Sequence, residues 1–295
     1  MNDYVIMTDS SCDLPQQTAD ELGVRVMPLA ITTGDGSVYR NYLDGREIPF
    51  DEFYSALRRG EHITTSAVNV GEFASAMDGI LREGRDILVI AFSSGLSTTC
   101  NSAELAARDM EEKYPGRKVI VVDSLCASLG QGLLVYLTAR KAAAEGLSLE
   151  EAADFAEGIK LRIHHWFTVA DLDQLKRGGR VSPAAAVVGN TLGIKPVLHV
   201  DDEGHLIPRF KVKGRHASLK KMADMMREHF DPLSPDQAVF ISHGDCMDDV
   251  DTLVGLIRSE TGYTGEVTVN YVGPVIASHS GAGTVALFFV GDARQ

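Results

Sequence analysis

Cysteine is scarce in this sequence, and long apolar runs are absent from it. Its four cysteines, Cys12, Cys100, Cys126 and Cys246, form no C-x-x-C pair and no Cys/His cluster at zinc spacing, so we predict neither a disulfide framework nor a metal site. No uncharged apolar run approaches the roughly 20 residues that a membrane span needs. The opening residues MNDYVIMTDSS lack the basic and apolar regions of a signal peptide. We therefore expect a cytoplasmic protein without stable membrane insertion.

Motifs for nucleotide binding and for common hydrolases are also missing. The sequence contains no P-loop and no G-x-S-x-G string. The string GAGTVA at 281–286 fits a loose dinucleotide pattern, but only nine residues follow it, which leaves no room for the acidic ribose contact about 20 positions on. We expect a tight turn beside His279 there. His164 and His165 have no partner at metal spacing, so we interpret them as structural residues and predict no cofactor.

Positive charge is in short supply overall, yet it is concentrated in one segment. The net charge of −13 disfavours nonspecific binding to nucleic acid. Residues 1–165 carry 15 Lys/Arg and 25 Asp/Glu, a net of −10, whereas residues 176–221 carry 10 Lys/Arg and three acids, a net of +7. Solvated strand faces would explain this basic segment, and so would an anionic ligand or partner.

Strands alternate with helices along the first half of the chain. This order predicts a parallel sheet covered on both faces. We expect one strand over 24–34, a Thr/Ser link between two helices at 64–66, and helix starts capped by Asp13 and by a capping box of Ser148 and Glu151.

The regular alternation of strands and helices ends after about residue 165. There we expect a hairpin that turns at 202–204 and final strands that flank a small-residue turn near 280. We therefore predict two α/β domains, residues 1–165 and residues 166–295.

Four polar segments lie where a ligand could bind. They are TDSSCD (8–13), TTS (64–66), SSGLSTTCNS (93–102) and DSLCAS (123–128). Ligands in open α/β sheets sit beyond the carboxyl ends of strands, where hydroxyls and free backbone N–H groups can hold an anion. The same residues also cap helices, so each segment has a purely structural interpretation. A Ser/His acyl hydrolase using Ser94 and His279 is the enzymatic alternative, and binding of another small carboxylate or phosphate is a third.

The segment LDQLKRGGRVS (172–182) is a candidate anion-binding loop. Two glycines let the backbone turn sharply, and Lys176, Arg177 and Arg180 gather around the bend. Arginine offers a planar donor fork that suits carboxylates and phosphates. The loop lies at the predicted domain junction.

Taken together, these strings resemble the DegV family of bacterial fatty-acid-binding proteins. The matching segments run from end to end: TDSSCDLP (8–15), TTS (64–66), SSGLSTTCNSA (93–103), FTVADLDQLKRGGRVS (167–182), GIKPVL (193–198) and GPVIASHSGAG (273–283). The resemblance implies a parallel-sheet N-terminal domain, a mixed-sheet C-terminal domain and a long-chain fatty acid such as palmitate, stearate or oleate between them. It also implies a non-catalytic role, in which the carboxylate is presented to an ATP-binding fatty acid kinase subunit that makes an acyl phosphate for phospholipid synthesis.

The resemblance further implies which residues hold the carboxylate. Their shared property is a hydroxyl or imidazole beside the proposed cleft: Thr64, Thr65, Ser66, Ser93, Ser94, His279 and Ser280. Arg180, with Lys176 and Arg177, is expected near the head group or the kinase. SHSGAG at 278–283 departs from the family's usual T-H-T-G-P-G but keeps His279 and a hydroxyl at Ser280, so head-group binding is expected to survive.

Overall fold

The computed structural model describes residues 4–170, 172–181, 193–231 and 237–294. The helices in this part of the chain are α1 (Gln16–Glu21), α2 (Phe50–Arg58), α3 (Val70–Arg82), α4 (Thr99–Lys113), α5 (Leu129–Glu145), α6 (Leu149–Ile159), α7 (Asp173–Arg177), α8 (Arg215–His229), α9 (Met247–Thr261) and α10 (Pro274–Ser280), with 3-10 turns η1 (Ser10–Cys12) and η2 (Lys160–Arg162). The strands are β1 (Tyr4–Asp9), β2 (Arg25–Met27), β3 (Ala30–Thr32), β4 (Val38–Arg40), β5 (Thr64–Ser66), β6 (Asp86–Ala91), β7 (Val119–Asp123), β8 (Ile163–Thr168), β9 (Ile194–Val200), β10 (Leu206–Lys213), β11 (Val239–His243), β12 (Val267–Tyr271) and β13 (Val285–Val290).

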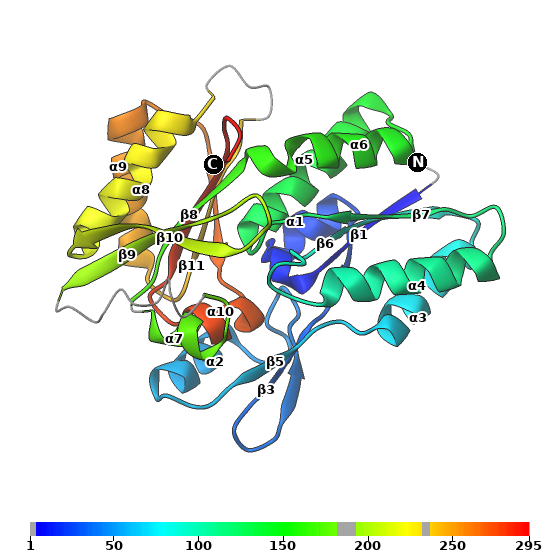
Figure 1. The fold of residues 1–295 in the computed structure, drawn as a ribbon, viewed down its shortest axis with the longest axis horizontal. Helices are drawn as coiled ribbons and strands as arrows, with labels where there is room; N and C mark the ends of the chain where they lie inside the picture. The colour runs from blue at the N-terminus through cyan, green and yellow to red at the C-terminus, as the bar shows by residue number, and fades with distance from the viewer. Residues whose placement is uncertain (1–3, 171, 182–192, 232–236, 295) are drawn as a thin grey trace.

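The N-terminal sheet is parallel, as predicted. Its strand order is β2-β1-β6-β7, and α3 and α4 cover one face while α5 and α6 cover the other (Figure 1). Strand β6 reads as a continuous apolar run because both of its faces are buried. The polar segments after β1, β6 and β7 therefore meet at one edge of this sheet.

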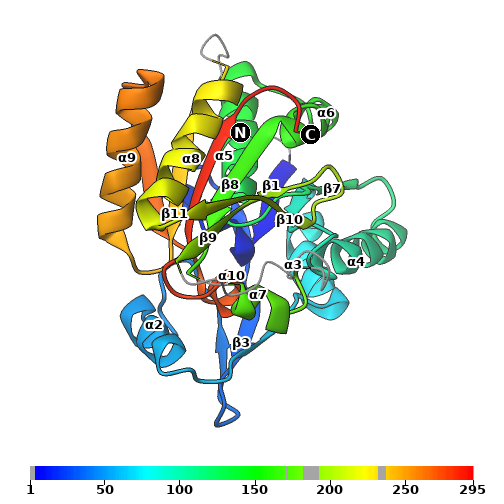
Figure 2. The ribbon, with the colours of Figure 1, turned by 60° about the vertical axis from the view of Figure 1, so that its left-hand side comes forward.

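The C-terminal sheet is mixed, with the order β10-β9-β8-β13-β11-β12. Its pairs are antiparallel except for β11 with β12. Strands β9 and β10 form the hairpin predicted to turn at 202–204. Helices α8 and α9 pack together over one face of this sheet (Figure 2). The mixed α/β class, with a parallel sheet followed by a mixed one, is thus confirmed.

Helix α5 lies between the two sheets. It contacts β6 of the first sheet and β8, β11 and β13 of the second, and most of its residues are buried. One apolar cluster runs from Leu88 and Ile90 through α5 to Phe240 and Phe288. The two sheets therefore share a hydrophobic core, and the edge that carries the polar segments faces the second sheet. Strand β8, which spans the predicted boundary at 165/166, lies within the second sheet; the boundary itself stays a prediction.

Four local expectations were wrong. Residues 24–34, expected to form one strand, divide into β2 and β3 of different sheets, because Pro28 lacks the N–H that a continuous ladder needs. Asp13, expected to cap α1, ends η1 in the left-handed region, and Pro15 is the N-cap. TTS at 64–66 is not a linker but strand β5, which pairs with β3 in a third, antiparallel sheet of order β4-β3-β5. The small-residue turn near 280 follows a short helix, α10.

Candidate functional site

A cavity of about 430 Å³ lies between the two sheets, within the usual range of ligand sites. Both halves of the chain contribute to its wall. The apolar part of the lining is Leu29, Ala67, Phe92, Leu96, Ala127, Phe167, Leu175, Val200, Leu206, Val272, Val275, Ile276, Ala286 and Phe288. Such a wall favours an apolar ligand over a densely polar one.

Several polar residues in the wall already have protein partners. The Ser128 hydroxyl donates to Asp13 Oδ2 at 2.6 Å and lies 2.9 Å from the Ser242 hydroxyl. His165 Nε2 accepts from the Ala127 N–H at 3.3 Å, and its other ring nitrogen bonds a backbone carbonyl. Burial lowers the pKa of His165 well below its ordinary value, helped by the charge of a nearby arginine. This part of the wall is therefore uncharged, and its polar atoms need no hydrogen bonds from a ligand.

The polar end of the cavity is built by α10, β5 and the turn after α7. His279, in the last turn of α10, has its Nε2 atom 2.9 Å from the Thr65 hydroxyl. Its Nδ1 atom and the Ser280 hydroxyl are buried and have no partner among the described residues. Buried polar atoms without partners are uncommon and costly. These two therefore mark the place where a ligand's polar group would be stabilised.

Arg180 supplies positive charge at the same end. Its Nε atom donates to the Leu96 carbonyl at 3.3 Å and its Nη1 atom to the Gly178 carbonyl at 2.5 Å. Burial, and secondarily the charge of Arg180, lowers the pKa of His279 to about 4. His279 is therefore neutral near pH 7, and Arg180 is the cationic group that faces an incoming anion there.

Gly178 is a site residue whose role the sequence did not indicate. A Cβ atom built on it would lie 2.3 Å from His279 Nδ1. Its φ of −71° suits any residue, so the requirement is for close approach and not for an unusual backbone. In the predicted basic loop, the first glycine thus seats His279, while Gly179, with φ +69°, makes the turn.

The other candidate residues divide into two groups. Ser66 and Ser94 line the cavity with Thr65, His279, Ser280 and Arg180. Thr64, Lys176 and Arg177 are solvent-exposed and lie outside the lining. The Ser93 hydroxyl is also outside it, because it donates to the Gly204 carbonyl at 3.0 Å. Ser182, the last residue of the predicted basic loop, is not among the described residues.

The first polar segment, 8–13, is a structural network and not part of the lining. Asp9 is fully buried and accepts from the Phe92 N–H at 2.8 Å and from Gln131 Nε2 at 3.2 Å. Asp13 reaches the cavity only through Ser128. Burial raises the pKa of Asp13 to about 8, against the lowering effect of its Ser128 hydrogen bond. Among the described contacts, Ser128 is the one cavity-lining residue that donates a hydrogen bond to Asp13.

The geometry does not favour a hydrolase. A Ser/His pair needs the imidazole on the nucleophile and an acid on the other ring nitrogen. His279 Nε2 is instead bonded to Thr65, and Gly178 packs against Nδ1 with no carboxylate bonded there among the described residues. The Ser94 N–H is held by Asp123 at 3.1 Å. The constellation is suited to holding a polar group in place.

Fold and site together define an α/β protein whose two large sheets enclose an apolar cavity, with hydroxyls, an imidazole and a guanidinium at one end. The family model described as "Uncharacterised protein, DegV family" matches residues 3–292. A DegV domain-containing protein of Clostridium perfringens is 40% identical, with both chains covered over their full length. The chain belongs to the DegV family, and the resemblance seen in the sequence is confirmed.

Solved structures of relatives have the same fold. A DegV family protein from Thermus thermophilus, described for its fatty acid binding, is 33% identical and superposes with a TM-score of 0.86, covering 99% of this chain and 100% of that one. A stearic acid-binding protein from Eubacterium ventriosum is 25% identical with a TM-score of 0.88, and 98% of each chain is covered. Among the described residues, no helix is both long enough and apolar enough to cross a membrane.

Proposed function

We propose that this chain binds one long-chain fatty acid, with the acyl chain in the cavity and the carboxylate at its polar end. The observation that carries the proposal is the pair of buried, unpartnered polar atoms, His279 Nδ1 and Ser280 Oγ, at the end of an apolar cavity. Fatty acid binding by the Thermus thermophilus relative and stearic acid binding by the Eubacterium ventriosum relative support this ligand class.

The apolar wall supplies the affinity. Burial of an acyl chain contributes about 0.8 kcal/mol per CH₂, so a chain of about 16 carbons gains on the order of 10 kcal/mol before the ordering costs of binding. The polar atoms of Ser128, Ser242 and His165 already bond protein partners. Covering them with an acyl chain therefore adds little desolvation cost. Methylene groups are thus the natural occupant of this space.

The polar end holds the carboxylate without enclosing it in charge. We assign His279 Nδ1, the Ser280 hydroxyl and Arg180 as its direct donors. The Thr65 hydroxyl then donates to His279 Nε2, and Ser66 and Ser94 lie at the rim of the lining. An ionised carboxylate taken out of water must be matched by donors, and Arg180 is the one cation in the described lining. Because neutral donors make part of the hydrogen bonds to the carboxylate, one carboxylate oxygen is left open to further chemistry.

Paired serine variants on one helix test the carboxylate assignment. Ser280→Ala should weaken palmitate binding about tenfold, the loss of one charge-assisted hydrogen bond. Ser278→Ala is the control, because that hydroxyl donates to the Pro274 carbonyl at 2.7 Å and does not line the cavity. Equal palmitate affinity for the wild type and Ser280→Ala, measured with both variants folded, would overturn the assignment.

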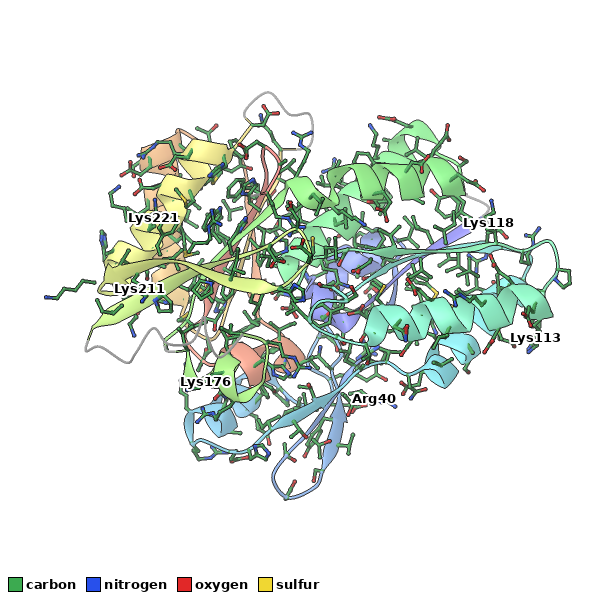
Figure 3. The ribbon with its side chains drawn as sticks, viewed as in Figure 1. Arg40, Lys113, Lys118, Lys176, Lys211 and Lys221 are labelled. Carbon is green, nitrogen blue, oxygen red and sulfur yellow. The ribbon has the colours of Figure 1, made fainter. Side chains whose placement is uncertain are left out.

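We further propose that the bound carboxylate is presented to an ATP-binding fatty acid kinase subunit, and that this protein performs no catalysis itself. Lys176 and Arg177 are exposed on α7, which packs against α10, the helix that carries His279. Figure 3 labels Lys176 at this position. Their charge is complementary to an acidic or nucleotide-loaded partner. An opening lined by the carboxylate donors and flanked by exposed cations suits a docking role.

The docking role is separable from lipid binding. Reversal of charge at both Lys176 and Arg177 to Glu should slow acyl-phosphate formation by a fatty acid kinase subunit at least tenfold and leave palmitate affinity unchanged. The control is the same double reversal at Arg117 and Lys118. Lys118 lies far from Lys176 (Figure 3), and Arg117 is its neighbour in the chain. Equal rates for both double variants would contradict docking through α7.

A further inference from the structure

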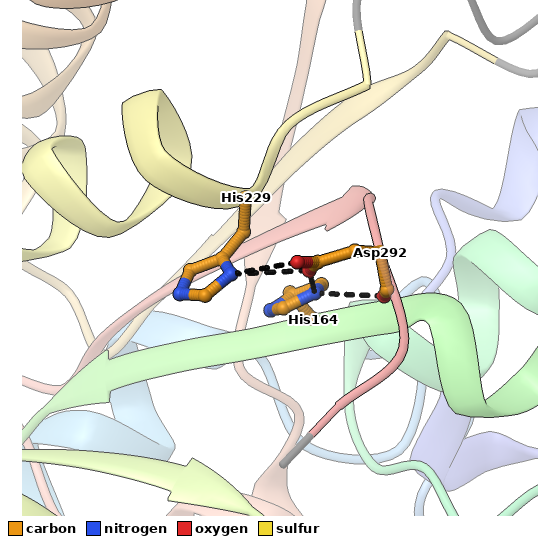
Figure 4. A group of neighbouring side chains, drawn as sticks. All are labelled: His164, His229 and Asp292. Atoms are coloured by element: carbon orange, nitrogen blue, oxygen red, sulfur yellow. Dashed lines mark hydrogen bonds and ion pairs between the residues drawn. The ribbon is translucent and has the colours of Figure 1, made fainter.

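Two histidines and an aspartate converge at one end of the two central strands of the C-terminal sheet, β8 and β13, away from the fatty acid cavity. His164 lies near the start of β8, His229 is the last residue of α8, and Asp292 lies just after β13 (Figure 4). Asp292 Oδ1 lies 3.2 Å from His164 Nε2 and 3.0 Å from His229 Nδ1. One ligand atom from each residue lies within 4.8 Å of those of the other two. The three ligand atoms are therefore close enough together to coordinate one metal ion.

We propose that His164, His229 and Asp292 form a binding site for a divalent transition metal of the zinc class. Two imidazole nitrogens and one carboxylate oxygen suit Zn²⁺ better than Mg²⁺ or Ca²⁺, which prefer oxygen ligands. Three protein ligands leave a fourth position for water or another group. Asp292 is 58% exposed, so a metal ion can enter from solvent.

The surrounding packing holds the three residues in this arrangement. The His164 ring stacks on Phe289 at 5.0 Å with an interplanar angle of 2°, and on His229 at 5.0 Å. Gly291 allows the chain to pass close to the cluster, since a Cβ atom there would lie 2.4 Å from the His229 carbonyl and 3.0 Å from His164 Nε2. The cluster is therefore preorganised by a buried ring and by a glycine that no other residue can replace without displacement.

The second coordination sphere sets a limit on affinity. A metal on Nε2 requires the His164 proton to sit on Nδ1, and this atom is buried with no partner among the described residues. Ligating histidines usually donate that proton to a carbonyl or carboxylate. We therefore expect weaker binding than at closed structural zinc sites.

The position of the site gives the metal a structural role. Arg294, two residues after Asp292, is buried and donates to the Leu125 carbonyl at 3.1 Å and the Lys160 carbonyl at 3.2 Å. A metal on Asp292 would fasten α8 and β8 to the segment that Arg294 ties to the N-terminal half. His165, beside His164, lines the fatty acid cavity, so the same strand carries both sites on its opposite faces.

Metal titration of untagged, chelator-treated full-length protein tests the proposal. Isothermal titration with ZnCl₂ should give one site per chain, and Zn²⁺ about 100-fold above Kd should raise Tm by roughly 5 °C. His229→Ala and Asp292→Asn should each weaken binding at least tenfold. Both residues are partly exposed, so these variants should fold, which the Tm of the metal-free proteins checks. Co²⁺ should give the intense visible absorption of a four-coordinate site.

The control is a histidine that also faces an aspartate. His205 Nδ1 lies 3.6 Å from Asp201 Oδ1 on an exposed turn, so His205→Ala should leave Zn²⁺ affinity unchanged. Absence of saturable Zn²⁺ binding by the wild type would mean that the cluster is a hydrogen-bonded bridge only, and would overturn the proposal. Unchanged affinity in both His229→Ala and Asp292→Asn would do the same.

Discussion

At the scale of single residues, the polar end of the cavity concentrates unsatisfied hydrogen-bonding capacity. His279 Nδ1 and Ser280 Oγ are buried without partners among the described residues, and each such atom costs about 1–3 kcal/mol. A carboxylate that bonds them recovers this free energy, so these atoms select for an acid and add to the affinity that the apolar wall supplies. The empty site is correspondingly less stable than the occupied one.

Gly178 positions His279, and an alanine there tests this. Gly178→Ala should displace the imidazole, because the new Cβ would lie 2.3 Å from Nδ1, and should weaken palmitate binding about tenfold, or about 1.4 kcal/mol. The control, Gly179→Ala, strains a backbone at φ +69° but meets no atom within 4 Å, so it should cost stability and not affinity. Calorimetric titration with palmitate measures the affinity of both variants. A larger loss of affinity in Gly179→Ala than in Gly178→Ala would refute the positioning role.

Residue identities in the site could be anticipated from the sequence only in part. Thr65, His279, Ser280 and Arg180 were predicted and converge, because residue type and the family's motifs both pointed to them. Ser93 was expected beside them, but a hydroxyl's direction depends on the turn that carries it, and this one faces Gly204. His164 was expected to be purely structural because the residues beside it in space lie 65 and 128 positions away along the chain.

At the scale of elements, the short helix α10 depends on its neighbours for its position. It has no side-chain cap, and it packs against α2, β3, β5 and α7. The Tyr54 hydroxyl, buried on α2, donates to the Val272 carbonyl at 2.6 Å, just before α10 begins. This bond therefore joins α2 to the segment that leads into α10, the helix that carries His279.

Tyr54→Phe should therefore cost more than the loss of an ordinary tyrosine hydroxyl. It leaves the Val272 carbonyl buried without its donor and should lower the free energy of unfolding by about 1–3 kcal/mol. Tyr263→Phe is the matched control, because its hydroxyl also donates to a carbonyl, that of Glu266 at 3.0 Å, at an exposed site. Urea unfolding of both variants gives the comparison, and equal losses would show that α10 does not depend on this bond.

Element types were better predicted than their boundaries. The alternation of buried strands with helices indicated the parallel sheet, and Ser148 with Glu151 forms the capping box expected at the start of α6. Helix α10 was missed because a proline followed by small residues and a glycine resembles a turn. Residues 24–34 were assigned to one strand because the pattern on both sides of Pro28 is apolar, and only tertiary pairing separates β2 from β3.

At the scale of the whole molecule, a buried polar chain links the two halves. Asp13 of the first half bonds Ser128, which lies 2.9 Å from Ser242 on β11 of the second. Asn270 on β12 also donates to the Asp13 carbonyl at 2.8 Å. These contacts, with the shared core around α5, fix the spacing of the sheets and hence the width of the cavity.

Asp13 should make stability depend on pH. Its pKa is raised from the ordinary 3.8 to about 8, so the folded protein holds this proton more tightly than the unfolded chain. Its stabilising contribution is complete below about pH 4 and is lost as the pH rises towards 8, by at most about 1.4 kcal/mol per pH unit. Asp13→Asn keeps an acceptor for Ser128 and should flatten that part of the profile.

Denaturant unfolding between pH 4 and 9 measures the difference between the wild type and Asp13→Asn. The variant should gain stability relative to the wild type as the pH rises to 8, and the difference should then stay constant. A difference that does not change with pH would mean that Asp13 is ionised in the folded protein at neutral pH.

The most direct measurement of the central claim is the native mass of untagged protein, with mass spectrometry of its organic extract. Binding of one long-chain fatty acid per chain predicts a single bound species whose mass matches the acid found in the extract. An extract without fatty acid, together with no mass shift after addition of palmitate or oleate, would contradict the account and leave the apolar cavity to a different ligand.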